Sequence, residues 1–151
     1  MWDSPANATL NRNKLIVTLD LKTGNGLEMA RALYAEADII IENFRPGKLV
    51  ELGVEFAEMR EARPELIIIS LPGFASNNME KRDQRAFESI IATSSGVLTD
   101  MGLNHVLMGL NPSFSPPPLA YAYASQIAAS ATVLALQSRQ ITGLGDQIEV
   151  L

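Results

Sequence analysis

The apolar residues of the chain gather in short runs, separated by segments in which they recur at helical spacing. Three of the runs are rich in β-branched residues and end at polar or turn residues, as strands do. They are residues 15–21 (LIVTLDL), 38–43 and 66–71 (LIIISL). The helical spacing covers residues 26–36, 47–52 and 56–63. Because the strands are continuously apolar and alternate with helices, the pattern predicts an α/β fold with a parallel sheet covered on both faces.

The second half of the chain continues the pattern with longer elements. We expect a polar loop, a helix, a long irregular segment rich in Gly, Asn, Ser and Pro, a long helix, and the start of a further strand. These are residues 75–85, 87–95, 96–118, 119–139 and 146–151. The whole chain, residues 1–151, is predicted to form a single α/β domain.

Polar and aromatic residues stand where the predicted strands end. The exits are Asp20-Leu21-Lys22, Asn43-Phe44-Arg45 and Pro72-Gly73-Phe74. In open parallel sheets, ligands bind outside the carboxyl ends of the strands. We therefore expect these three exits to share one rim of the sheet and to form a ligand site there.

Composition narrows the function. The net charge of −5 argues against nucleic acid or an anionic membrane as the main partner. With no cysteine and one histidine, His105, the chain has no thiolate nucleophile and no means of building a multi-histidine metal site, so no metal is expected. The N-terminus has no apolar run like that of a signal peptide, which predicts a cytoplasmic protein. Residues 101–138 carry no charge, and we interpret their second half as a helix of a soluble core rather than a membrane span.

Several blocks of sequence resemble the family III CoA-transferases, which include formyl-CoA transferase, carnitine CoA-transferase and α-methylacyl-CoA racemase. The blocks are NRNK, VTLDLKT, ADIIIENFRPGKLVELGV, RPELIIISLPGF, AFESIIATSSGVL and TGLGDQIEV, in family order and spacing. The resemblance implies a Rossmann-like domain that binds coenzyme A (CoA), in proteins that form interlocked dimers. Family members are a good deal longer. The chain resembles the middle part of their large domain, so the predicted fold is incomplete relative to the family.

The resemblance also implies the residues that contact CoA. They are Leu19, Lys22, Asn43, Phe44 and Arg45, with a further segment at Arg85, Ala86, Phe87 and Glu88. Lys22, Arg45 and Arg85 are suited to the pyrophosphate and the 3′-phosphate. The ring of Phe44 offers a face for the adenine or the pantetheine arm. Each cation taken alone is better explained as a solvated residue at a strand end, whereas three cations at corresponding family positions favour a ligand. One family contact, an arginine, falls on Glu51, which reverses its charge.

The catalytic position differs from the family pattern. The transferases use an aspartate nucleophile near the start of the long helix, and that position falls on Tyr121. A phenol cannot form the enzyme-bound CoA thioester through which acyl transfer proceeds. The racemases use a His–Asp pair, and those positions fall on Phe87 and Tyr121. Glu88 retains a carboxylate, which either orients the site, acts as an acid or base, or belongs to an exposed helix surface.

Three functions remain open from the sequence. The first is a CoA-transferase that moves CoA between an acyl-CoA and a carboxylic acid. The second is a catalytically inactive CoA-binding module or partner subunit, which the tyrosine at the nucleophile position favours. The third is an α/β fragment that folds as an oligomer without catalysis. The resemblance to interlocked dimers predicts self-association, or a partner chain that completes the site.

Overall fold

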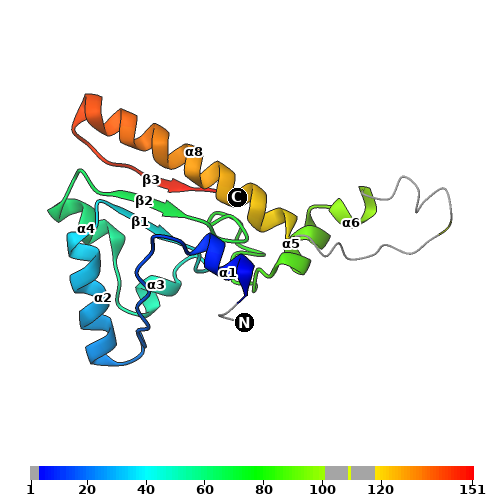
Figure 1. The fold of residues 1–151 in the computed structure, drawn as a ribbon, viewed down its shortest axis with the longest axis horizontal. Coiled ribbons are helices and arrows are strands. Elements are labelled where there is room, and N and C mark those ends of the chain that lie inside the picture. The colour runs from blue at the N-terminus through cyan, green and yellow to red at the C-terminus, as the bar shows by residue number, and fades with distance from the viewer. Residues whose placement is uncertain (1–3, 101–108, 110–117) are drawn as a thin grey trace.

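The computed structural model describes residues 4–100, 109 and 118–151. Its centre is a parallel sheet of three strands in the order β1-β2-β3 (Figure 1). The strands are β1 (Ile39–Glu42), β2 (Ile67–Ser70) and β3 (Gln147–Glu149). The register pairs Glu42 with Ser70, and Ser70 with Glu149, at the carboxyl ends. The predicted parallel α/β fold is therefore confirmed, as is the strand expected after the long helix.

Helices cover both faces of this sheet. The helices of the described residues are α1 (Pro5–Leu10), α2 (Gly24–Glu36), α3 (Lys48–Glu51), α4 (Phe56–Ala62), α5 (Glu88–Ser94), α6 (Val97–Asp100) and α8 (Leu119–Thr142), not all of which contact the sheet. The long helix α8 runs along one face, while α2 and α4 lie on the other (Figure 1).

The middle strand β2 is the core of the molecule. Ile67, Ile68 and Ile69 are fully buried. Ile67 and Ile69 pack with Ala128 and Ala135 of α8, whereas Ile68 lies in a cluster bordered by residues of α2 and α4. Because successive side chains of a strand point to opposite faces, a strand covered on both sides needs every position apolar. This accounts for the LIIISL pattern.

The first predicted strand, residues 15–21, is wrong. The structure has no strand there, and no backbone hydrogen bond joins residues 15–19 to another described segment. Leu15, Ile16 and Val17 are 99%, 61% and 58% exposed. β-Branched composition favours an extended backbone, but a strand forms only beside a partner edge. No described strand lies next to this segment, so it stays unpaired.

The remaining differences concern helices. α1 and α6 were not expected, and α6 occupies the start of the segment predicted to be irregular. Most of that segment, residues 101–108 and 110–117 with His105, lies outside the described residues.

The long helix extends to Thr142 and ends at Gly143, whose φ of 74° lies in the left-handed region that favours glycine. Among the described residues it is the one helix long and apolar enough to meet the requirements of a membrane span, with 11% of its most apolar window buried. The expected burial of this helix is only partly right. Ala128 and Ala135 are buried against β2, but Leu134 and Ile141 on its outward side are exposed.

Candidate functional site

A cavity of about 1100 Å³ lies at the carboxyl ends of all three strands. Its lining comes from the residues that follow β1 and β2, from the loop before α5, from the first turns of α8, and from Val150 and Leu151 after β3. This is the position at which open α/β sheets bind their ligands. The cavity also has the size of a small-molecule or cofactor site.

The cavity brings together most of the residues predicted to form the site. They are Asn43, Phe44, Arg45, Arg85, Ala86, Phe87 and Tyr121. These residues come from three segments far apart in sequence, and all of them reach the same rim because the strands are parallel.

The first wall is the turn after β1. The Glu42 carboxylate accepts a hydrogen bond from the Phe44 N–H at 2.7 Å, which closes the chain tightly behind the strand. Gly47 follows with a φ of 76°, a conformation that favours glycine, and α3 starts there. The turn leaves the Phe44 ring 37% exposed and lining the cavity. An aromatic face is thus presented to any ligand in the cavity.

The cations of this wall are already paired with carboxylates. Lys48 Nζ lies 2.7 Å from Glu51 Oε2, and an Arg45 nitrogen lies 3.4 Å from Glu51 Oε1. The hydrogen bond from Lys48, with the charges of Lys48 and Arg45, holds the pKa of Glu51 below its usual range. A second Arg45 nitrogen lies 3.6 Å from Asp83. Glu51 therefore competes with any anionic ligand for two of the cavity's cations.

The second wall is the loop between β2 and α5. Arg82 and Arg85 line the cavity from this loop. Arg82 lies 3.9 Å from Asp83. Arg85 is exposed, and among the described residues its guanidinium has neither an ion pair nor a hydrogen bond. Arg85 is thus the cavity cation most available to an anion.

The third wall is the start of α8, which Glu88 holds in place. Glu88 begins α5 and is half-buried. Its Oε1 accepts from the Ala120 N–H at 2.8 Å, and its Oε2 accepts from the Tyr121 N–H at 3.0 Å. The first N–H groups of a helix have no partner within the helix, and a carboxylate there also complements the helix dipole. This geometry fits the orienting role better than that of an exposed helix residue.

Tyr121 itself faces the cavity with a half-exposed side chain. Glu88 and Asp83 are both engaged: the two Glu88 oxygens cap α8, and Asp83, which carries the side-chain carboxylate among the described lining residues, pairs with arginines. The side chain of Asp100 lies outside what the structure describes. The described lining therefore offers no free carboxylate for nucleophilic attack.

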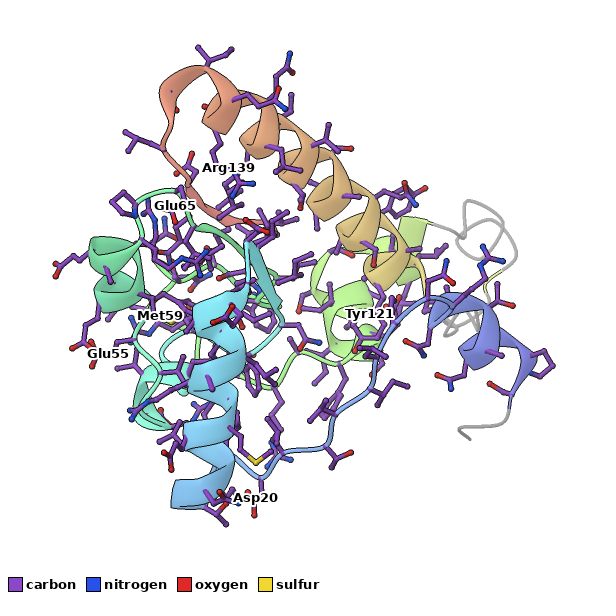
Figure 2. All side chains as sticks on the ribbon, turned by 60° about the vertical axis from the view of Figure 1, so that its left-hand side comes forward. Asp20, Glu55, Met59, Glu65, Tyr121 and Arg139 are labelled. Carbon is purple, nitrogen blue, oxygen red and sulfur yellow. The ribbon has the colours of Figure 1, made fainter. Side chains whose placement is uncertain are left out.

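Leu19 and Lys22 are not brought to this cavity. They lie in or just after the segment that forms no strand, and their neighbour Asp20 lies well away from Tyr121 (Figure 2). A strand exit reaches the rim only if its strand belongs to the sheet. Asp20-Leu21-Lys22 follows no strand of the sheet, so this predicted part of the rim is missing in this structure.

The sequence reading missed several lining residues. Lys48, Phe74, Arg82 and Tyr123 also face the cavity. A signal for Lys48 was its place directly after the ENFRPG turn, and for Tyr123 its spacing of two from Tyr121. Arg82 lies in a polar loop, and no sequence signal distinguished it as a lining residue. Among the described residues, no group of three or more His, Asp or Glu side chains is placed to hold a metal ion.

Comparison with known sequences gives a consistent result. The family CoA-transferase family III matches residues 1–151. The CoA-transferase/lyase DddD of Marinomonas sp. (strain MWYL1) is 57% identical over 149 residues, which are 99% of this chain and 18% of that protein. The succinyl-CoA–D-citramalate CoA-transferase of Chloroflexus aurantiacus is 31% identical over 145 residues, 93% of this chain and 34% of that protein.

Solved structures share the fold. A hypothetical protein from Mycobacterium tuberculosis aligns with a TM-score of 0.79 at 27% identity, covering 92% of this chain and 38% of that one. A CAIB/BAIF family protein from Brucella suis aligns with a TM-score of 0.78 at 28% identity, covering 89% and 34%. The chain thus spans about a fifth to two fifths of the length of these relatives. Because the family match covers every residue, the chain belongs to CoA-transferase family III.

Proposed function

We propose that this member of CoA-transferase family III binds CoA or an acyl-CoA in the cavity at the carboxyl ends of its strands. One observation carries the proposal. The cavity gathers Asn43, Phe44, Arg45, Arg85 and Phe87, which the family resemblance had marked as CoA contacts, around a single space. These residues come from two segments that are some forty positions apart in the sequence.

The charges and rings of the cavity suit the chemistry of CoA. Its pyrophosphate and 3′-phosphate are anions that guanidinium groups bind through charge-assisted hydrogen bonds. Arg85 has no ion pair among the residues that the structure describes, and Arg45 becomes free if the ligand displaces both Glu51 and Asp83. The ring of Phe44 gives an apolar face for the uncharged parts of the ligand. A protein with a net charge of −5 needs such a local concentration of cations to hold an anion.

We further propose that this chain, taken alone, binds the thioester without transferring its CoA. In the transfer reaction a carboxylate oxygen attacks the thioester carbonyl carbon, and the C–S bond breaks as the CoA thiolate leaves. The thiolate then attacks the enzyme carbonyl carbon of the resulting anhydride, the substrate acyl group leaves as a free carboxylate, and CoA stays on the enzyme carboxyl group as a thioester. Tyr121 stands at the nucleophile position, and the nearby Glu88 is occupied by two N–H groups. Transfer therefore needs a carboxylate from elsewhere.

The relatives' length bears on where that carboxylate comes from. Since the chain spans 18% to 38% of the relatives compared above, we propose that the full reaction, between an acyl-CoA and a carboxylic acid, requires further protein. A second copy of this chain or a different partner chain would complete the site. We also propose that the protein works in the cytoplasm. Light scattering on the purified chain, with and without CoA, tests self-association. A strict monomer in both would contradict the part of the proposal that relies on a second copy.

The first experiment is a thermal melt of the chain with and without CoA. A ligand that binds only the folded state raises the melting temperature. We expect Arg85→Ala to weaken CoA binding about 10- to 100-fold, as befits the loss of a charge-assisted hydrogen bond of about 1.5–3 kcal/mol. Arg12→Ala is the matched control, because Arg12 is exposed and lines neither cavity. A melt that CoA leaves unmoved would refute the proposal.

Tyr121→Asp tests the catalytic part separately. The wild-type chain is expected to bind CoA without measurable acyl transfer, and the aspartate variant to keep binding and gain transfer or a trapped CoA thioester. Mass spectrometry of the variant after incubation with an acyl-CoA detects the thioester. Transfer by the wild type at the same rate as by the variant would show that Tyr121 does not limit the reaction.

A further inference from the structure

The loop that carries Arg82 and Arg85 is a closed structure of its own. Its two ends meet, because a Cβ placed on Gly73 would lie 1.7 Å from the Cβ of Ala86. Inside it, the Asn78 side-chain oxygen accepts from the N–H groups of Glu80 and Lys81 at 3.2 and 3.1 Å. The Asn78 carbonyl accepts from the Arg82 N–H at 2.9 Å. Residues 73–86 thus have the character of a compact Ω-loop.

Few described contacts fix this loop to the sheet. One is the hydrogen bond from the Ser76 N–H to Glu149 Oε1 at 3.0 Å. Another is the ion pair between Asp83 and Arg45 at 3.6 Å, whose side chains are 64% and 36% exposed. An exposed ion pair is weak and is screened by salt. The hydrogen bond to Glu149 is exposed as well, but it joins a charged acceptor to a backbone N–H at a shorter distance, which favours it as the tether.

Glu149 is well placed to act as a tether. It is the last residue of β3 and lies opposite Ser70 in the register of the sheet, and the next residue, Val150, is buried in the core. The carboxylate is therefore carried by a rigid element. Glu149 lines a second cavity of about 310 Å³ and not the first. It acts on the loop from outside the proposed CoA site.

We propose that Glu149 is a positioning residue, which holds the loop 73–86 so that Arg82 and Arg85 face the phosphates of CoA. This inference rests on the proposed function. A loop that is already ordered in the free protein binds a ligand more tightly, because binding then does not carry the entropic cost of ordering the loop. Glu149 supplies that order from the edge strand, and the arginines make the contact.

Binding measurements with CoA test the tether. We expect Glu149→Ala to weaken CoA binding roughly tenfold through lost pre-organisation. Glu149→Gln, which retains an acceptor oxygen, should stay within about twofold of the wild type. Glu28→Ala is the matched control, an exposed glutamate of α2 that lines neither cavity. It should bind CoA as the wild type does.

A double-mutant cycle separates positioning from a general structural effect. If Glu149 works through Arg85, then Glu149→Ala should add little to the loss already caused by Arg85→Ala. Fully additive losses would overturn the proposal, because they would mean that Glu149 affects binding by another route.

Amide hydrogen exchange without ligand tests the tether independently of CoA. The Ser76 amide should exchange faster in Glu149→Ala and at the wild-type rate in Glu149→Gln. Unchanged exchange in Glu149→Ala would overturn the proposal even if binding fell. A wild-type chain that does not bind CoA would instead refute the proposed function, and the exchange data would still decide whether Glu149 holds the loop.

Discussion

The two ends of the sheet are held together by opposite chemistry. At the amino ends of the strands, arginines from outlying helices donate to backbone carbonyls. Arg139 of α8 reaches the carbonyls of Asp38 and Glu65 at 3.4 and 3.2 Å, just before β1 and β2. Arg60 of α4 reaches the carbonyl of Gly145, before β3, at 3.3 Å. Figure 2 shows Arg139 and Glu65 close together, away from Tyr121.

At the carboxyl ends, glutamates accept hydrogen bonds from backbone N–H groups. Glu42 holds the turn after β1, Glu149 holds the loop 73–86, and Glu88 holds the start of α8. Each of these three acids fixes one wall of the cavity. None of them is among the residues that line it.

The contacts at the amino ends of the strands therefore contribute to stability, whereas those at the carboxyl ends shape the cavity in which we propose that a ligand binds. The arginines clamp the carbonyls that precede the three strands, at the end of the sheet opposite the cavity. At the other end Glu42, Glu88 and Glu149 accept from backbone N–H groups, while Glu51 and Asp83 pair with other cations than Arg85. Because these carboxylates are engaged, the cavity presents cations in spite of the chain's overall negative charge, as the proposed binding of an anion requires.

The sharpest test of this comparison is Arg139→Ala. We expect the free energy of unfolding to fall by about 1–3 kcal/mol, because two backbone carbonyls lose a charged donor. Affinity for CoA should not change. Urea unfolding and CoA titration measure the two quantities. Arg139→Lys should restore only part of the stability, since the ammonium lacks the planar fork. A matching loss of CoA affinity would mean that the two ends are not independent.

A gain of binding is expected from Glu51→Gln. This change removes the carboxylate that pairs with Lys48 and Arg45, so that Lys48 becomes available to the phosphates and Arg45 keeps only its ion pair with Asp83. CoA affinity should rise a few-fold, and the gain should shrink at high salt. Glu51→Arg, which restores the arginine of the family pattern, should raise it further. Glu61→Gln, on the exposed side of α4, is the control. Unchanged affinity in all three would show that Glu51 does not restrain these cations.

The smallest expected effect concerns pH at the amino end. The hydrogen bond from its own N–H, together with the Arg63 and Arg139 charges, lowers the pKa of Glu65 in the folded chain. Since this pKa lies below the unfolded value, the stabilisation is complete above the unfolded pKa and is lost as the pH falls through the folded one. The stability difference between wild type and Glu65→Gln should therefore shrink in acid. A difference that stays constant with pH would contradict this assignment.

Much of the fold was predictable from pattern. The buried strand β2 follows from a continuous apolar run, and the end of α8 follows from Gly143. The segment 15–21 shows the limit, because its residues favour an extended backbone yet find no partner in this structure. Lys22 consequently does not reach the cavity, although its residue type and its spacing were as convincing as those of Arg45.

The sequence by itself determined the family, CoA-transferase family III, and the residue types at the candidate site. These types are cations and an aromatic ring after the strands, and a tyrosine where the transferases have a carboxylate. These are properties of residue types in order. Only the tertiary structure decided which residues meet and which charges are free. Arg45 and Arg85 look alike in sequence, yet Arg45 is paired with Glu51 and Asp83, whereas Arg85 has no ion pair within the described part of the chain. Ion pairing depends on distances between segments that are remote along the chain, and no local pattern encodes them.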